Sequence, residues 1–265
     1  MRRPGLFARL GLASRYEQSL TEIVTEAVQL LVDKDAAEDE PSLNRKLYQS
    51  IISTYHRRRM RGEDAPDFAP AFDAPNPPLS YEFTPSENKR PDLRWDLVDH
   101  LSEAISVRSF AVECKRLRSK STAGWQFNKS YALHGVARFV EPDHQYGGNM
   151  ASGTMVGYWQ NMGRSAVLTE VNAALTSIGL PNLEFDSEPS GLLHQTDQVL
   201  NRPFKISPYR LRHLWFDMRS VEAAKEAEEA FAKKGKSGPN PVTQVGTPGA
   251  EPKSHSGSSS DGTAT

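Results

Sequence analysis

The stretch SVRSFAVECKRLRSK, residues 106–120, constrains the fold most, because it combines the pattern of a buried strand with a polar end. It predicts a β-strand over residues 108–117, in which alternate side chains share a face. The apolar side chains as far as Cys114 then point into a core. Glu113 and Lys115 stand on the opposite face, so an acid and a lysine lie side by side at the end of this strand.

A second strand is predicted shortly before the first, over residues 93–99, where LRWDLVD alternates between apolar and charged side chains. The alternation places Asp96 on the polar face. If the two strands are neighbours, we expect Asp96 to converge with Glu113 and Lys115. Such a trio suits metal-assisted hydrolysis of a phosphodiester, since carboxylate oxygens bind Mg²⁺ and an ammonium group balances negative charge that develops on the phosphate.

The rest of the chain predicts helices on both sides of these strands. The expected elements are helices over 16–33 and 42–60, a loop over 62–92, the strands over 93–99 and 108–117, a helix over 123–140, a glycine-rich loop over 141–153, a helix over 154–178, strands over 191–200 and 209–219, and a helix over 221–233. Residues 234–265 are rich in Gly, Ser, Pro and Thr, and we expect them to be disordered.

We therefore predict an α/β fold in which helices flank a central mixed sheet. The fold forms one domain over residues 1–233, with N-terminal helices at 16–60 and a catalytic core at about 80–220. The single cysteine excludes an internal disulfide and fits a reducing compartment. No apolar run approaches the roughly 18–20 residues that span a bilayer, so we expect a cytoplasmic protein without a membrane segment.

The pair RPDLRWDLVD and FAVECKRL resembles the PD-(D/E)xK nuclease superfamily, which has the restriction-endonuclease-like fold. The resemblance implies an αβββαβ core with helices before it. It assigns Asp96 as the first metal-binding acid, Glu113 as the second and Lys115 as the catalytic lysine. The backbone carbonyl of Cys114 is implied as a further ligand of the Mg²⁺ or Mn²⁺ ion.

Several acids compete for places in this implied site. The literal Pro-Asp pair of the motif ends at Asp92, but we prefer Asp96 because it lies inside the alternating strand. Asp99 is a third option. Superfamily members often add an acid from a helix before the first strand, and Glu38 or Glu40 is suitably placed for that part.

Local charge agrees with a nucleic-acid substrate. Residues 89–138 contain ten basic and five acidic side chains, a local charge of +5, whereas the whole chain carries −1. Basic groups around a carboxylate site hold phosphates. The candidates for this role are Arg116, Arg118, Lys120, Lys129 and Arg138. A second basic run, HRRRMR at 56–61, ends a predicted helix, where it either complements the helix dipole or contacts DNA.

Two further residue types bear on the site. Trp125 follows the basic run, and we expect it to be the tryptophan nearest to nucleic acid. His134 and His213 lie in otherwise apolar elements, and we expect both to be hydrogen-bonded core residues.

These observations predict a Mg²⁺- or Mn²⁺-dependent endonuclease that cuts DNA as the effector of a prokaryotic antiviral defence or restriction system. The resemblance implies a homodimer, and a partner protein of the defence system would supply recognition. RNA is a further possible substrate. The alternative is an inactive nuclease-like module that binds nucleic acid or scaffolds a complex. Carboxylates of Asp96 and Glu113 within about 5 Å of each other could share one hydrated metal, whereas splayed or buried, paired carboxylates favour the alternative.

Overall fold

The computed structural model describes residues 6–31, 38–63, 69–77, 84–99, 106–185, 191–204 and 206–236. Its elements are α1 (Leu6–Gln29), α2 (Glu40–Met60), β1 (Ala71–Phe72), the 3-10 helix η1 (Pro85–Asn88), β2 (Leu93–Asp99), β3 (Ser106–Leu117), α3 (Phe127–Leu133), the 3-10 helix η2 (Val136–Phe139), β4 (Ser152–Trp159), α4 (Arg164–Ser177), β5 (Leu193–Leu200), β6 (Tyr209–Asp217) and α5 (Val221–Lys236).

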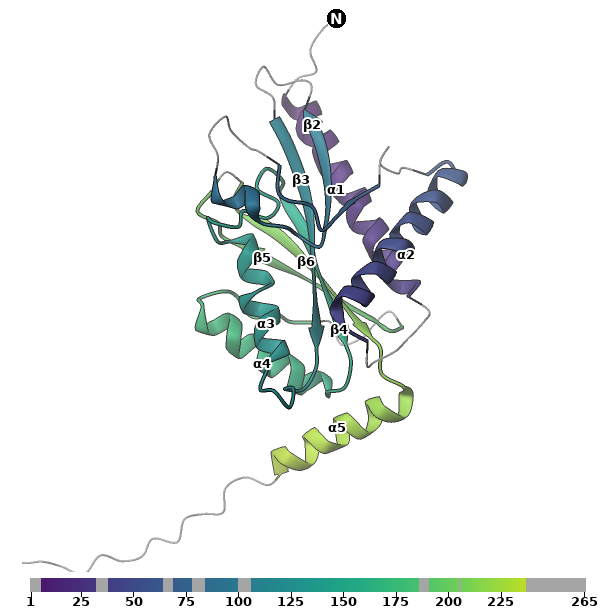
Figure 1. Cartoon of the computed structure of the whole chain (residues 1–265), viewed down its shortest axis with the longest axis vertical. Coiled ribbons are helices and arrows are strands. Elements are labelled where there is room, and N and C mark those ends of the chain that lie inside the picture. Colours follow the sequence, from purple (N-terminus) through teal and green to yellow (C-terminus); the bar gives the residue numbers. More distant parts are fainter. Residues whose placement is uncertain are drawn as a thin grey trace, which may run out of the picture.

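These strands form one mixed sheet in the order β1-β2-β3-β4-β6-β5. The first three strands are an antiparallel meander. The chain then crosses through α3 to β4, which runs parallel to β3, and β6 adds a further parallel strand beside β4. The edge strand β5 is antiparallel to β6 (Figure 1). The predicted α/β fold with a central mixed sheet flanked by helices is therefore confirmed.

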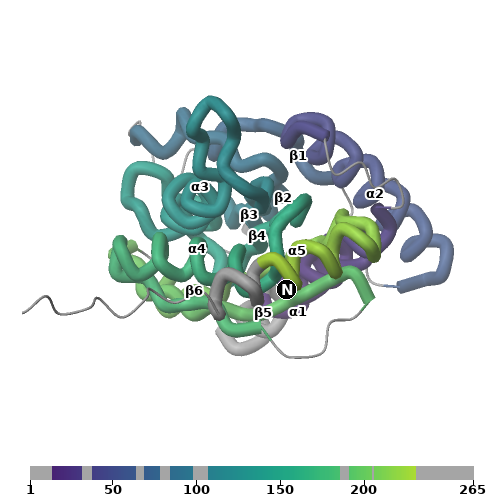
Figure 2. The backbone as a smooth tube through the Cα atoms, turned by 90° about the horizontal axis from the view of Figure 1, so that it is seen from below, coloured from purple at the N-terminus to yellow at the C-terminus, as the bar shows by residue number. Residues whose placement is uncertain are grey.

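Helices cover both faces of the sheet (Figure 2). Apolar side chains of α1 and α2, such as Leu20 and Leu47, pack in one core with Phe110, Val112 and Cys114 of β3. A second core on the other face contains side chains of α3, α4, β4 and β6. Cys114 is buried and is the free thiol of the described chain. The acid and lysine of β3 lie on the α3 side of the sheet, where Ala111 belongs to the second core.

The prediction of one helix over residues 154–178 is wrong, because its first part is the central strand β4. Both faces of β4 are buried, so its sequence lacks the alternation of a half-exposed strand. Gly157 allows close packing here, since a Cβ atom would lie 2.5 Å from Leu117 Cδ1 and 2.8 Å from Trp215 Cδ1. Only Arg164–Ser177 is helical.

Other boundaries also differ from prediction. The expected helix over 123–140 is α3 followed by η2, and the expected loop over 62–92 contains the short strand β1 and η1. The first helix begins at Leu6, ten residues before the expected start. The last helix extends to Lys236, and residues 237–265 of the expected disordered tail lie outside the described residues.

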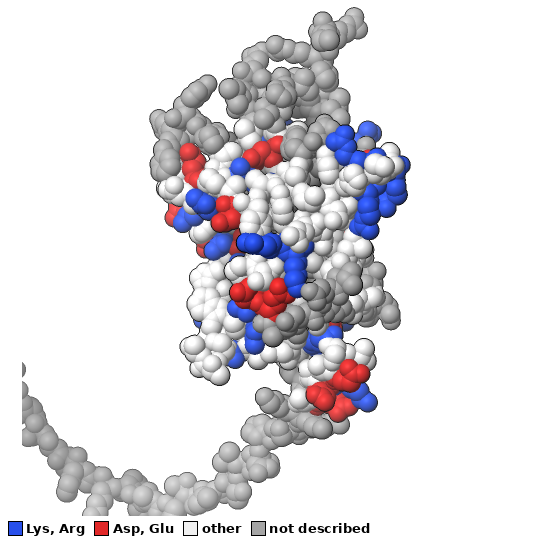
Figure 3. Space-filling view, turned by 45° about the vertical axis from the view of Figure 1, so that its right-hand side comes forward, with Lys and Arg blue, Asp and Glu red and all other residues white. Residues whose placement is uncertain are grey.

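The second basic run lies at the C-terminal end of α2, and its arginines form ion pairs with acids of neighbouring segments. Arg58 contacts Glu22 at 2.9 Å and Glu63 at 3.1 Å, and Arg61 also contacts Glu63. Figure 3 shows the resulting basic cluster over the end of α2. Within the described part of the chain, no helix has the length and apolar character to cross a membrane.

His213 is buried, as predicted, in a polar cluster inside the second core. Its Nδ1 lies 2.7 Å from the Tyr131 hydroxyl and its Nε2 lies 3.1 Å from Gln198 Oε1. The Tyr131 hydroxyl also accepts a hydrogen bond from Trp215 Nε1 at 3.0 Å. Burial lowers the pKa of His213 from its ordinary value to about 3.

We expect this buried imidazole to make the free energy of unfolding depend on pH. The unfolded chain binds a proton at His213 below pH 6.5 but the folded chain does not, so stability falls as pH drops from 7.5 to 5. The loss from this group is about 2 kcal/mol. Urea unfolding measured at pH 7.5 and at pH 5 should show that His213→Gln loses less stability than the wild type between these pH values, by that amount. An equal loss in the variant would contradict the assignment.

Candidate active site

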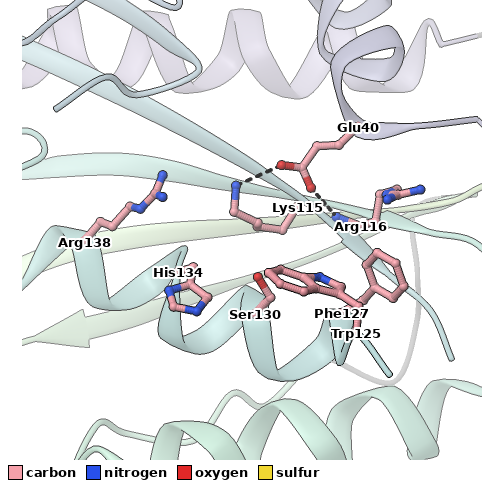
Figure 4. A pocket seen from close by; sticks show the side chains of 8 residues that line it. All are labelled: Glu40, Lys115, Arg116, Trp125, Phe127, Ser130, His134 and Arg138. Atoms are coloured by element: carbon pink, nitrogen blue, oxygen red, sulfur yellow. Dashed lines mark hydrogen bonds and ion pairs between the residues drawn. The ribbon is translucent and has the colours of Figure 1, made fainter. Parts of the chain in front are cut away.

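The candidate site lies where the β2–β3 hairpin meets the first turn of α2 and the side of α3. Glu113 and Lys115 project from β3, Asp92 directly precedes β2, Glu40 opens α2, and Arg138 belongs to η2. These five side chains are joined by ion pairs or electrostatic contacts. Part of this group lines a pocket (Figure 4).

Glu113 is the centre of this group. Its side chain is 1% exposed, and its Oε1 lies 2.8 Å from Lys115 Nζ and 2.5 Å from Arg138 Nη1. Its other oxygen, Oε2, is buried and has no hydrogen-bond partner. Burial raises the pKa of Glu113, while the neighbouring cations Lys115 and Arg138 oppose this rise.

Asp92 stands beside this carboxylate because of the hairpin register. Leu93 pairs with Val112, so the residue before Leu93 reaches the level of Glu113. Asp92 Oδ2 accepts a hydrogen bond from the Cys114 backbone N–H at 2.7 Å. Burial, and then the charge of Glu113, raises the pKa of Asp92 well above its ordinary value. A buried carboxyl whose pKa is raised by burial and by a neighbouring carboxylate is typical of catalytic sites.

The expected convergence of Asp96 with Glu113 and Lys115 is wrong. Asp96 does share their face of the sheet, but it pairs with Ser109, whose hydroxyl donates to Asp96 Oδ1 at 2.6 Å. Its Oδ2 contacts Arg94 at 2.7 Å. Asp96 lies four residues after Asp92 along the extended chain, a rise of about 13 Å. Asp99 lies farther along β2, opposite Ser106.

Lys115 is held as a cation by three acceptors. Its Nζ lies 2.8 Å from Glu113 Oε1, 3.0 Å from Glu40 Oε1 and 2.8 Å from the Cys114 carbonyl oxygen. Burial alone would lower the pKa of Lys115, but the charges of Glu113, Asp92 and Glu40 outweigh it and raise the pKa above its ordinary value. The group therefore acts as a fixed positive charge and not as a base.

Glu40 reaches the site because α2 begins earlier than its apolar pattern indicates. Asp39 caps the helix by accepting the Ser42 backbone N–H at 2.9 Å, and Pro41 is tolerated in the first turn. Glu40 then contacts Lys115 and also accepts the Arg116 backbone N–H at 3.3 Å. The other expected acid of this region, Glu38, instead pairs with Lys46 at 2.7 Å.

Asn44 is a residue of the site that sequence reasoning missed. It lies on α2, is 5% exposed, and donates from Nδ2 to Asp92 Oδ1 at 2.9 Å. Its own Oδ1 accepts the Tyr158 hydroxyl at 3.0 Å, which fixes the orientation of the amide. The available signal was a polar residue on the apolar stripe of α2, next to Leu43 and Leu47.

The pocket beside these residues has a volume of about 450 Å³. The residues that line it are Glu40, Lys115, Arg116, Trp125, Phe127, Ser130, His134 and Arg138. Figure 4 shows Ser130 on α3 and His134 just after its end, across the pocket from Glu40 and Lys115. His134 is exposed, so its prediction as a core residue is wrong, because the helix α3 ends one residue before it, at Leu133.

Of the five basic residues predicted to hold phosphate, only some lie at the pocket. Arg116 and Arg138 line the pocket. Arg118 lies next to it, with its guanidinium 5.3 Å from the Phe127 ring centroid. Lys120 and Lys129 are exposed and do not line this pocket.

The donor set beside Glu113 fits a hard divalent cation. Among the described residues, no cluster of three or more His, Cys, Asp or Glu side chains forms a metal site. The set here is instead two carboxylates, Asp92 and Glu113, with the Cys114 carbonyl nearby. Mg²⁺ is commonly held by one or two carboxylates and keeps several waters. The buried, unpartnered Glu113 Oε2 is an oxygen that a cation would satisfy.

Comparison with known proteins finds no matching family model, curated protein or solved structure.

Proposed function

We propose that this protein is a metal-dependent nuclease of the PD-(D/E)xK type that hydrolyses phosphodiester bonds of DNA. One observation carries the proposal: Asp92, Glu113 and Lys115 meet at one end of a hairpin, beside a pocket lined by arginines. In this proposal Asp92, the competing acid of the literal Pro-Asp pair, takes the role of first metal-binding acid that the resemblance had assigned to Asp96.

The connectivity of the chain supports the proposal. The order α2-β1-β2-β3-α3-β4, with an antiparallel meander and a parallel crossover, has the sequence of the αβββαβ core that the resemblance implies. The acid-x-lysine triplet lies on the strand before the crossover helix, at the level of the residue that precedes β2.

The side chains would divide the chemistry as follows. Asp92, Glu113 and the Cys114 carbonyl would hold Mg²⁺ or Mn²⁺, which supplies a Lewis acid and lowers the pKa of bound water. Lys115, which stays charged, orients the attacking water and balances negative charge on the phosphate. Arg138 contacts Glu113 and lines the pocket, so it can turn to the phosphate of an incoming strand.

Broader parts of the function remain predictions of this proposal. A nuclease with these groups would serve as the effector of a prokaryotic defence or restriction system in the cytoplasm. A partner protein would direct it to its target, and a homodimer would cut both strands.

The proposal is tested by cleavage of supercoiled plasmid and linear DNA with Mg²⁺, Mn²⁺ or EDTA. We expect cutting that requires metal and is lost in Lys115→Met, which keeps the aliphatic stem but removes the charge. The matched control is Lys225→Met, because Lys225 is exposed on α5, away from the site. Thermal melts of each variant confirm folding. Metal-dependent cutting that survives in a folded Lys115→Met protein would contradict the proposal.

A second candidate is an inactive nuclease-like module that binds nucleic acid. The observation that favours it is the pairing of buried Glu113 with both Lys115 and Arg138, which already compensates the carboxylate. This candidate predicts salt-sensitive DNA binding without cutting, retained in Lys115→Met. An RNA substrate tested in the same assay separates the two nucleic acids.

A further inference from the structure

Trp125 differs from the other tryptophans of the chain in its exposure. Its side chain lies at the pocket and the residue is 55% exposed, whereas Trp95, Trp159 and Trp215 are each 1% exposed. Leaving a large indole half in water forgoes the stabilisation that burial would provide. An exposed aromatic face in a pocket with basic walls is the arrangement that stacks an unpaired base.

Hydrogen bonds in the turn before α3 fix the backbone of Trp125. The Trp125 backbone N–H donates to Ser121 Oγ at 2.9 Å, and the Trp125 carbonyl accepts the Ser121 N–H at 3.0 Å. Gly124, between them, donates its N–H to the Ser121 carbonyl at 2.9 Å and has a φ of +88°, which favours glycine. The backbone of the exposed residue therefore belongs to a hydrogen-bonded turn, so little ordering of this backbone is needed when a ligand binds.

Cations and a second aromatic ring continue the surface beside Trp125. The Arg116 guanidinium lies 4.7 Å from the centroid of the Phe127 ring, and both residues line the pocket. Arg116 Nε is without a hydrogen-bond partner in the described structure. At the other end of the pocket Arg138 lies near Lys115 (Figure 4). One wall thus offers stacking, and guanidinium groups at both ends offer phosphate contacts.

We propose that the pocket binds one unstacked nucleotide of single-stranded or locally opened DNA, with its base on the Trp125 indole and its flanking phosphates at Arg116 and Arg138. A base inside an intact duplex has both faces covered by its neighbours, so the indole favours strands in which a base is free. The volume of about 450 Å³ is within the range of small-molecule sites. This inference rests on the proposed function, because it names the form of substrate for the same site.

The experiment uses the intrinsic fluorescence of the full chain in EDTA, so that binding is read without cleavage. Because Trp125 is the exposed tryptophan and the other three are buried, quenching by an added oligonucleotide reports on this indole. We expect an oligothymidine strand to quench the emission, and a matched blunt duplex to quench it far less. Anisotropy of a labelled strand should show a Kd about 5- to 150-fold higher than that of the wild type for Trp125→Ala. For Trp125→Phe the Kd should be near the wild-type value.

Several results would overturn the inference. These are strand binding with unchanged emission, equal quenching by the duplex, equal affinity of Trp125→Ala and wild type, or tighter binding of oligouridine than of oligothymidine. The outcomes also separate this inference from the proposed nuclease. Quenching without cleavage of any substrate would contradict the proposed nuclease activity but not the stacking site. Metal-dependent cleavage that does not depend on Trp125 would contradict the stacking site but not the nuclease activity.

Discussion

Replacing Asp92 with asparagine is expected to reduce metal-dependent DNA cleavage by roughly 10²–10³-fold or more, the scale seen when one charge-stabilising group is removed from an active site. The same change at Asp96 should leave cleavage close to wild type. Asp92 lies beside Glu113 and accepts the Cys114 N–H, whereas Asp96 is held by Ser109 and Arg94 farther along the strand. The two variants are chemically matched and differ only in position.

Stability provides a second readout for this pair. The pKa of Asp92 is raised by burial and by Glu113, so its charged form opposes folding at neutral pH. Stability from this group is fully present below the ordinary pKa of 3.8, and it is lost as pH rises from there through the raised pKa. An asparagine carries no charge, and its amide oxygen can still accept the Cys114 N–H, but its Nδ2 would then face the Asn44 donor and lose that hydrogen bond. We therefore expect the urea midpoint of the wild type to fall relative to that of Asp92→Asn as pH rises from 4 to 7.5, while cleavage by the variant is lost.

The opposite ranking would refute the assignment. If Asp96→Asn lost cleavage and Asp92→Asn retained it, the first acid would be the one inside β2. The catalytic group would then have to form through a rearrangement of the hairpin. Loss of cleavage in both variants with lowered urea midpoints would indicate damage to the hairpin and not to the chemistry.

Replacing Arg202 with leucine is expected to lower the free energy of unfolding by about 3 kcal/mol or more, because it leaves buried carbonyl groups without donors. Arg202 is 6% exposed, and its guanidinium donates to the carbonyls of Tyr146, Gly147 and Met150 at 3.0–3.3 Å. It also lies 3.8 Å from the centroid of the Tyr209 ring. Burial lowers the pKa of Arg202.

The matched control is Arg212→Leu on the neighbouring strand β6. Arg212 pairs with Asp197 at the surface, where such pairs contribute only about 0–1 kcal/mol. Urea unfolding of both variants measures the contrast. Equal midpoints would show that the carbonyls near Arg202 find other partners.

The effect of Arg202 should extend toward the site. Tyr146, whose carbonyl Arg202 holds, donates its hydroxyl to the Arg90 carbonyl at 2.6 Å, two residues before Asp92. The Arg138 guanidinium lies 5.8 Å from the centroid of the same ring. Loss of Arg202 removes the donor that holds the Tyr146 carbonyl, and Tyr146 links this region to Arg90 and Arg138. We therefore expect weaker cleavage in the leucine variant even at temperatures where it is folded.

Local sequence patterns predicted the two strands of the hairpin and part of the polar cluster at its end. The alternation in β2 and β3 is clear because one face is apolar and the other is polar, and it placed Glu113 and Lys115 correctly on one face. It did not reveal β4, since a strand buried on both faces has no alternation. The role of Asn44 also escaped detection, because its partner Asp92 is 48 residues away in the chain.

The sequence by itself determined which faces of the strands carry the acids and the lysine, because side-chain direction in a strand repeats every two residues. It favoured Asp96 over Asp92 on its place inside the strand, although both have the same parity and therefore the same face. Only the tertiary structure shows that Asp92, and not Asp96, lies beside Glu113, through the pairing of Leu93 with Val112. The docking of α2 and the crossover to η2 then brought Glu40 and Arg138 to the same carboxylate cluster. Register and docking depend on contacts between distant segments, which no local pattern contains.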